Sequence, residues 1–289
     1  MVGTQIGPAI VAILVSMLLS SCSGSRQIVV ASKNFTESVL LGEIAAQHLE
    51  NRLHVKVDRR LNLGGTLLVQ QSIIAGAVDV YPEYTGTAIT SVLKLQASSD
   101  AKKVFETVAR EYRQRFHVEW APPLGFNNSF AMVIRGDDPA NANLKTISDV
   151  ARRHKPVVLG VGYEFVKRPD GLAGLLSTYD LKIDGSPKEM DLGLLYSAMQ
   201  QKQIEMAAVS ATDGLIDAMK LRVLEDDKHY FPPYEAAFLT RRPELLPVLS
   251  ELSGKLTDSL MRKLNYEIDG QHRPVPVVAR EFLSNLSHP

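Results

Sequence analysis

Residues 27–52 read QIVVASKNFTESVLLGEIAAQHLENR, a short apolar run that passes directly into a longer amphipathic pattern. The run at 27–31 predicts a β-strand. Beyond it, Leu40, Ile44 and Leu49 recur at helical spacing, which predicts a helix over 36–52 with one apolar side. A strand followed at once by a helix is the unit of parallel sheets, because a parallel strand pair needs a long crossover connection.

The same alternation continues through most of the chain. Further strands are predicted near 55–57 and at 78–81, 130–134, 156–160 and 206–209, with helices at 65–75, 101–116, 146–153 and 193–201. Beyond Pro243 the pattern is helical, at 244–252, 258–267 and 277–285. Repetition of this kind predicts an α/β protein whose mainly parallel sheets are covered by helices on both faces.

Two proline-containing segments interrupt this pattern, PPLG at 122–125 and FPP at 231–233. Proline fixes φ and removes a backbone donor, so each segment ends regular structure. Two such crossings predict that the chain leaves a first lobe, builds a second and returns. We therefore expect one lobe from residues 27–129 and 232–289, and a second lobe from residues 130–231.

The composition excludes two broad classes of protein. The 289 residues are 45% hydrophobic and 22% charged, with 32 Lys and Arg against 32 Asp and Glu. A disordered chain would be poorer in apolar residues and more one-sided in charge. A nucleic-acid-binding protein would usually show a basic stripe, and the basic clusters here are only short pairs, so no nucleic-acid partner is expected.

The N-terminal segment predicts export rather than a part of the fold. Residues 1–21 carry no charged side chain and contain a predominantly apolar run at 10–19, which suits a signal peptide better than a permanent membrane span. The run ends in LSSC at 19–22, which looks like a bacterial lipobox, and Cys22 is the only cysteine in the chain. We expect residues 22–26 to be a lipidated linker.

Lipidation at Cys22 would anchor the mature protein to a bacterial membrane, in the periplasm or at the cell surface, by acyl chains. Full processing of this signal peptide is left open, because no Lys or Arg precedes the apolar run as it usually does in signal peptides.

Sequence motifs for the standard reaction chemistries are missing. There is no glycine-rich nucleotide loop, no H-E-x-x-H and no G-x-S-x-G, and the seven histidines show no metal-ligand spacing. We therefore predict no catalytic residue, no metal site and no cofactor. A two-lobed α/β protein of this kind is most simply a binding protein, with its ligand where the carboxyl ends of strands meet a cleft.

Several ordered segments resemble the glycine betaine/carnitine/choline-binding lipoproteins of osmoprotectant ABC importers. They are ASKNFTE (31–37), LGGT (63–66), VDVYPEYTGT (78–87), GFNN (125–128), EF (164–165), RPDG (168–171), TDG (212–214), DDK (226–228) and FPPY (231–234). The resemblance implies a type II-like periplasmic-binding-protein fold, with two α/β lobes, a hinge and a ligand cleft that closes like a trap. It also implies a small zwitterionic or cationic solute as ligand and an ABC permease with its ATPase as partner. A monomer fits such a trap.

The ligand class sets the chemistry of the expected site. A quaternary ammonium cannot donate a hydrogen bond, so electron-rich ring faces hold it best, each for roughly 0.5 to 2 kcal/mol. The family builds its cage largely of tyrosines, and the corresponding positions here are Tyr84, Phe130, Ser210 and Tyr234. A ligand carboxylate needs a fork of donors, and Arg168 lies where the family places its carboxylate-binding arginine.

The resemblance adds four further ligand-binding positions. Lys33 and Asn34 belong to the first strand-to-helix loop, and Thr87 and Asp213 belong to cleft-facing turns.

Two positions depart from the tyrosine pattern. Phe130 keeps a ring face, whereas Ser210 removes a wall of the cage. The loss could cost about one or two kcal/mol for a compact trimethylammonium, or it could make room for a larger ligand. The alternative hypothesis is therefore an ergothioneine-like betaine or a solute that is not a betaine.

Structural explanations remain for the single residues. Tyr84 and Tyr234 lie next to prolines and could be ordinary turn aromatics. Arg168 could belong to a surface turn, and Asp213 could be a helix N-cap. Lys33 could be a rim charge, which would repel a cation but favour a carboxylate. Asp213 with Lys33 is also the one acid–base pair that an enzyme could use, although we expect no enzyme.

Overall fold

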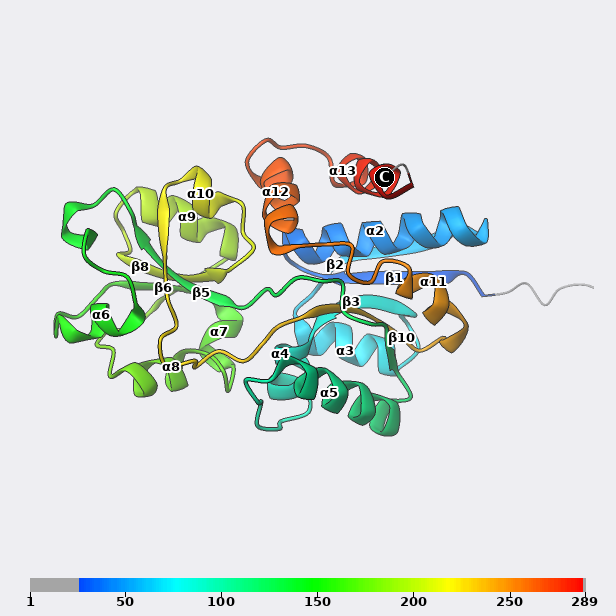
Figure 1. Cartoon of the computed structure of the whole chain (residues 1–289), viewed down its shortest axis with the longest axis horizontal. Helices are drawn as coiled ribbons and strands as arrows, with labels where there is room; N and C mark the ends of the chain where they lie inside the picture. The colour runs from blue at the N-terminus through cyan, green and yellow to red at the C-terminus, as the bar shows by residue number, and fades with distance from the viewer. Residues whose placement is uncertain (1–25, 288–289) are drawn as a thin grey trace, which may run out of the picture.

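The computed structural model describes residues 26–287, which form two five-stranded sheets, each in its own half of the molecule (Figure 1). The first sheet, in the order β2-β1-β3-β10-β4, contains β1 (Ile28–Lys33), β2 (Val57–Gly64), β3 (Val80–Tyr84), β4 (Glu119–Trp120) and β10 (Ala236–Thr240). The second sheet, in the order β7-β6-β8-β5-β9, contains β5 (Phe130–Arg135), β6 (Leu159–Gly162), β7 (Lys188–Met190), β8 (Met206–Ser210) and β9 (Leu221–Leu224). The α/β class predicted from the sequence is confirmed.

Helices cover both faces of each sheet. The first sheet carries α2 (Thr36–Leu53), α3 (Thr66–Ile74), α4 (Thr85–Thr87), the π-helix η1 (Ala88–Val92), α5 (Ala101–Phe116), the 3-10 turn η3 (Pro243–Leu245), α11 (Leu246–Ser250), α12 (Asp258–Asp269) and α13 (Val275–Ser287). The second sheet carries the 3-10 turn η2 (Pro139–Asn141), α6 (Ile147–Arg152), α7 (Tyr163–Lys167), α8 (Leu172–Tyr179), α9 (Leu192–Gln200) and α10 (Leu215–Ala218).

Strand β1 shows why each sheet has two cores. Ile28 and Val30 pack with α2, α11, α12 and α13 on one face, whereas Val29 and Ala31 pack with α3 and α5 on the other. Successive side chains of a strand point to opposite faces, so a run of apolar residues predicts burial on both sides. The same layering is visible in Figure 1, where α2 and α13 lie on one side of the first sheet and α3 and α5 on the other.

Both sheets are mixed, which corrects the expectation of mainly parallel sheets. β1 pairs in parallel with β2 and β3, but β10 runs antiparallel to both of its neighbours. In the second sheet β6 pairs in parallel with β7 and β8, whereas β5 runs antiparallel to β8 and β9. β5 and β10 are the strands that the chain enters directly after crossing between the sheets. They begin at the end where the parallel strands finish, so they run in the opposite direction.

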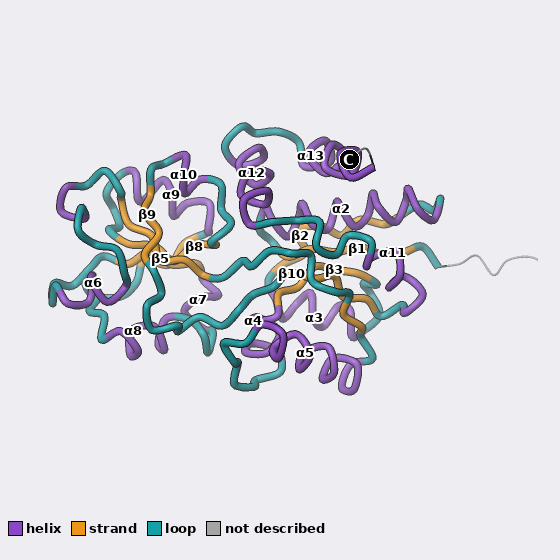
Figure 2. Tube along the Cα trace, viewed as in Figure 1, coloured by secondary structure: helices purple, strands orange, loops and turns teal. Residues whose placement is uncertain are grey.

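The two crossing segments, residues 121–129 and 225–235, lie side by side between the sheets (Figures 1 and 2). They bond to each other: the backbone N–H of Asn128 donates to the carbonyl of Tyr234 at 3.0 Å. The backbone N–H of Tyr234 in turn donates to Oδ1 of Asn127 at 2.6 Å. Both crossing segments contain prolines, and these bonds join them to each other.

The predicted signal peptide at residues 1–21 and the predicted lipidation site Cys22 lie outside the described residues. Among residues 26–287, no helix combines the length and the apolar character needed to cross a bilayer.

Candidate functional site

A cavity of about 520 Å³ lies between the two sheets. The parallel strands end at it, through Lys33 of β1, Tyr84 of β3 and Ser210 of β8, and β5 begins at it with Phe130. The nine residues expected to contact a ligand all line this cavity: Lys33, Asn34, Tyr84, Thr87, Phe130, Arg168, Ser210, Asp213 and Tyr234. The topology therefore brings together residues that are far apart in the sequence.

Aromatic rings form one wall of the cavity. The ring centroids of Phe130 and Tyr234 are 5.7 Å apart with the planes at 82°, and Phe165 lies 4.9 Å from Phe130. Tyr84 lies further along the lining and packs against Phe35 at 6.1 Å. Sequence reasoning did not single out Phe165 or Phe35 as lining residues, although both lie in the segments that carry the family resemblance.

Arg168 is bound on several sides. Its Nε and Nη2 donate to the carboxylate of Asp170 at 2.9 and 2.7 Å, and its Nη1 donates to Thr87 at 3.3 Å. The guanidinium carbon lies 5.2 Å from the centroid of Phe130 and 5.8 Å from that of Tyr234. Burial opposes the charged form, but Tyr234 and Asp170 outweigh it and raise the pKa of Arg168. The positive charge of Arg168 is therefore balanced within the protein.

Lys33 is also paired. Its Nζ forms a buried ion pair with Glu83 and lies 5.0 Å from the ring centroid of Tyr84. Within the described residues Lys33 thus pairs with Glu83 rather than with Asp213, the partner that an acid–base mechanism would need.

Glu37, which the sequence did not single out, is a buried carboxylate with four hydrogen-bond donors. Oε1 accepts from the hydroxyl of Tyr84 and from Nδ2 of Asn128, both at 2.7 Å. Oε2 accepts from Thr212 at 2.5 Å and from Nδ2 of Asn265 at 3.0 Å. Burial raises the pKa of Glu37, and the four donors partly offset this rise. Because Glu37 lies on α2 and Thr212 follows β8, this carboxylate ties the two sheets together.

We call the region formed by Tyr196, Asp213 and Asp269 the acidic end of the cavity. Asp213 accepts from the backbone N–H of Leu215 at 3.0 Å, but the N-cap residue of α10 is Gly214 and not Asp213. Burial raises the pKa of Asp213 to about 6. Hydrogen bonds from the Tyr196 hydroxyl and from the backbone N–H of Leu215 oppose this rise of the pKa, and the charge of Asp269 adds to it. Asp269 accepts from Thr36 at 2.7 Å, and burial raises its pKa.

The lining as a whole favours a cation. Its basic side chains are Lys33 and Arg168, and both are neutralised by Glu83 and Asp170. Its acidic side chains are Glu37, Glu164, Asp191, Asp213 and Asp269. A cavity with rings and surplus carboxylates attracts positive charge more than negative charge.

Glu164 of α7 reaches across to the first sheet. Its Oε1 accepts from the backbone N–H of Thr66 at 3.1 Å, at the N-terminus of α3. The contact requires a glycine before Thr66, since a Cβ on Gly65 would lie 1.9 Å from Oε1 of Glu164. This bond is a further link between the two halves, beside those of Glu37 to Thr212 and of Arg168 to Thr87.

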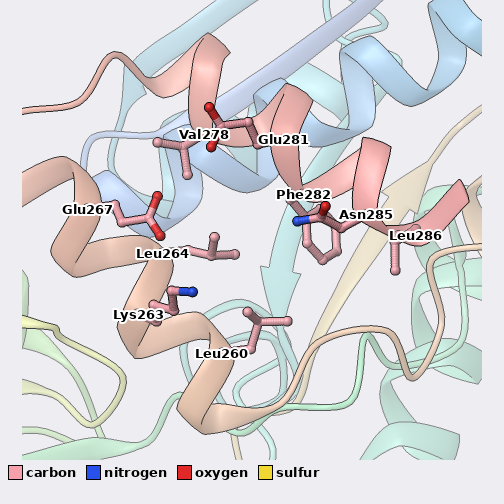
Figure 3. Close-up of a pocket in the computed structure, with 9 residues that line it drawn as sticks. All are labelled: Leu260, Lys263, Leu264, Glu267, Val278, Glu281, Phe282, Asn285 and Leu286. Carbon is pink, nitrogen blue, oxygen red and sulfur yellow. The ribbon is translucent and has the colours of Figure 1, made fainter. Parts of the chain in front are cut away.

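A smaller hollow of about 210 Å³ lies between α12 and α13, away from the predicted site residues (Figure 3). Leu264 and Phe282 contribute apolar surface to it. Arg273 bridges the two helices through ion pairs with Glu267 and Glu281 at 2.5 and 2.6 Å. The hollow is therefore a gap between two packed helices. Within residues 26–287, no group of three or more His, Cys, Asp or Glu side chains is arranged to hold a metal ion.

Comparison with known proteins gives consistent matches over nearly the whole described chain. The family model for the substrate-binding domain of ABC-type glycine betaine transport systems matches residues 26–285. The chain is 33% identical over 288 residues to the carnitine transport binding protein OpuCC of Listeria monocytogenes, covering 94% of this chain and 93% of the relative.

Two further matches extend the comparison. The chain is 34% identical over 268 residues to the ergothioneine transport permease/ergothioneine binding protein EgtU of Helicobacter pylori, covering 90% of this chain and 48% of that relative. A crystal structure of a glycine betaine/carnitine/choline ABC transporter has a TM-score of 0.74 and 30% identity, covering 90% of this chain and 98% of that one.

Proposed function

Because the chain belongs to the family of substrate-binding domains of ABC-type glycine betaine transport systems, we propose that it captures a quaternary-amine solute outside the cytoplasm and delivers it to an ABC permease. The observation that carries the proposal is the cavity between the sheets, with aromatic side chains and surplus carboxylates in its lining. A quaternary ammonium cannot be held by hydrogen bonds, so ring faces and nearby negative charge are the groups that select it.

Three rings take the cation in this proposal: Tyr84, Phe130 and Tyr234. Asp170 balances the charge of Arg168, so an uncompensated guanidinium does not repel a cation near the rings. Where the ligand carries a carboxylate, Arg168 and Lys33 take it, with Asn34, Thr87, Ser210 and Asp213 completing the contacts. No bond is made or broken, so the protein is not an enzyme.

The trap works by movement of two lobes about the crossing segments. We assign residues 27–129 and 232–289 to one lobe and residues 130–231 to the other. The protein acts as a monomer, held to the membrane by lipid on Cys22, and its partner is a permease with its ATPase.

A second candidate ligand is a larger betaine of the ergothioneine type. Two observations favour it: Ser210 contributes no ring where the cage expects one, and the cavity volume of about 520 Å³ is in the range that holds drug-sized ligands. The relative from Helicobacter pylori, by its name, binds ergothioneine.

Calorimetric titration tests the proposal. Protein stripped of ligand by unfolding and refolding is titrated with glycine betaine, choline, carnitine and ergothioneine, and at least one should bind saturably at one-to-one stoichiometry. Tyr234→Ala should weaken that binding about tenfold, because one ring face is worth roughly 1.4 kcal/mol.

Tyr179→Ala is the matched control. Tyr179 is as buried as Tyr234 and its hydroxyl also donates to an aspartate, Asp226, but it does not line the cavity. Equal losses of affinity in the two variants would contradict the aromatic cage. If the folded protein bound none of the four solutes, the proposed function itself would be contradicted.

A further inference from the structure

The two tyrosines that are expected to contact the cation each donate their hydroxyl to a buried carboxylate. Tyr84 donates to Oε1 of Glu37 at 2.7 Å, and Tyr234 donates to Oδ2 of Asp170. All four residues are buried. A tyrosine ring is attached to the chain at its Cβ, so a hydrogen bond at the opposite end fixes the direction in which the ring face points. The two carboxylates therefore orient the two rings.

Each carboxylate also accepts a threonine hydroxyl from the opposite half of the molecule. Glu37 lies on α2, beside the first sheet, and its Oε2 accepts from Thr212, which follows β8 of the second sheet. Asp170 lies between α7 and α8, beside the second sheet, and its Oδ2 accepts at 2.8 Å from Thr90 of η1, beside the first sheet. The same arrangement thus occurs twice, with the two halves exchanged. In each case one carboxylate joins a ring of the site to a threonine across the interface.

The two threonines lie behind the site rather than in it. Within the described residues, neither Thr90 nor Thr212 belongs to the lining of the cavity, and neither does Asp170. A ligand in the cavity therefore does not contact these threonines. Any effect of their hydroxyl groups on ligand binding has to act through the carboxylates that they bond.

Thr90 has two acceptors for a single proton. Its Oγ1 lies 2.7 Å from the carbonyl oxygen of Gly86 and 2.8 Å from Oδ2 of Asp170. A hydroxyl group carries one hydrogen, so Thr90 donates to only one of the two at a time. Gly86 belongs to the same half of the molecule as Thr90, whereas Asp170 belongs to the other half. The bond to Asp170 can therefore break as the halves separate without leaving the hydroxyl unpaired.

We propose that Glu37 and Asp170 are positioning residues that couple closure of the two halves to the orientation of the cation-binding rings. When the halves separate, each carboxylate loses its threonine and gains water, so each tyrosine hydroxyl loses a fixed acceptor. The rings then reach their binding geometry only in the closed form, which a bound cation in turn stabilises. The inference rests on the proposed function, since it concerns the rings that take the cation.

Thr212→Val and Thr90→Val test the coupling, because valine keeps the shape of threonine and removes the hydroxyl. The probe is whichever of glycine betaine, choline, carnitine and ergothioneine binds the ligand-stripped protein most tightly. Each variant should bind it about fivefold or more weakly, since a hydrogen bond to a charged group is lost. Stopped-flow measurements should assign most of this loss to faster dissociation, because the two bonds form only after the halves have closed.

Two further variants serve as controls. Thr240 is also a buried threonine, but its hydroxyl bonds to the backbone of Arg242, within the same half of the molecule. Thr240→Val should therefore keep the wild-type affinity to within about twofold. Thr212→Ser keeps the hydroxyl and should recover most of the affinity that Thr212→Val loses. Thermal melting of the ligand-free protein verifies that each variant is folded.

Double-mutant cycles separate coupling from simple contact between the halves. Tyr84→Phe and Tyr234→Phe keep each ring and remove the hydroxyl that bonds the carboxylate. Thr212→Val and Tyr84→Phe share Glu37, so together they should cost no more than about twofold beyond the larger single loss. The corresponding pair around Asp170 should behave in the same way. Thr212→Val and Tyr234→Phe share no carboxylate, so their fold-losses should multiply.

Three outcomes decide the proposal. Fold-losses that multiply around one carboxylate as well as between the two would overturn the coupling and leave the threonines as ordinary contacts between the halves. Unchanged affinity in both threonine-to-valine variants would overturn it as well. Either result leaves the proposed function intact, because the wild-type protein still binds its solute. If the folded wild-type protein bound none of the four solutes, the proposed function would be overturned together with the coupling.

Discussion

Asp213 titrates differently in the folded protein and in the unfolded chain. Burial raises its pKa to about 6, and Asp269 adds to the rise. The folded protein therefore holds this proton more tightly than the unfolded chain does. The resulting stabilisation is fully present below the unfolded pKa, near 4, and is lost as the pH rises through 6.

Asp213→Asn should remove this dependence. At pH 7.5 the wild-type protein carries a buried charge that the variant lacks, so we expect the variant to be the more stable of the two. Between pH 7.5 and pH 5 its advantage should shrink by about 1 kcal/mol, because each unit of pKa shift corresponds to about 1.4 kcal/mol. Denaturant unfolding at the two pH values measures the difference, and a constant offset would contradict the assignment.

The positions of the nine expected site residues could be predicted because motifs fix them locally in the chain. Tyr84 and Tyr234 stand at fixed distances from prolines, and the topology then brings them to one cavity. Glu37 and Tyr196 could not be predicted in this way. Each looks like an ordinary residue on a helix, and its role depends on partners that only the tertiary fold supplies.

Helix α6 begins with a capping box formed by Thr146 and Asp149. Thr146 accepts from the backbone N–H of Asp149 at 3.0 Å, and Asp149 accepts from the backbone N–H of Thr146 at 2.9 Å. Two orphan donors of the first turn are thereby satisfied.

Thr146→Ala should lower the free energy of unfolding by about 1 kcal/mol, since the N-cap acceptor is lost. For a chain of this size the melting temperature should fall by about 2 to 4 °C. Thr146→Ser keeps the hydroxyl and should melt close to the wild type. α6 does not line the cavity, so ligand affinity should not change in either variant, and a change would show that α6 is coupled to the site.

The sequence predicted amphipathic helices more accurately than strands. The predicted helix at 101–116 coincides with α5, because its buried residues Val104, Val108 and Tyr112 recur at helical spacing. β4 and β7 were missed because they are two and three residues long. β10 was missed although AAFLT at 236–240 is wholly buried, since a short apolar run has no periodicity that separates strand from helix.

Several polar contacts link the two halves of the molecule, and one of them depends on a residue outside the cavity lining. Gly65 is not a lining residue, but its missing Cβ leaves room for Glu164 to accept from Thr66. Gly65→Ala should displace that carboxylate and weaken ligand binding about tenfold, through faster dissociation, because a hydrogen bond to a charged group is lost. Stopped-flow release of bound ligand measures the effect.

A double-mutant cycle with Glu164→Ala tests whether Gly65→Ala weakens binding by displacing the Glu164 carboxylate. If Gly65→Ala acts by displacing Glu164, adding it to Glu164→Ala should change the affinity no further. A full additional loss in the double variant would mean that the alanine disturbs the N-terminus of α3 itself.

The position of β10 in the chain also determines the order in which the two sheets can fold. Among the strands of residues 26–287, β10 is the only sheet neighbour of β4 and the one that joins β4 to β3, yet it follows the whole of the second sheet in the chain. The second sheet is built from one uninterrupted segment, so its contacts can form as soon as that segment has been synthesised. The first sheet needs a loop closure that spans the other half of the protein, and loop closure of high contact order is slow. The half that contains the start of the described chain is therefore the half that finishes folding last.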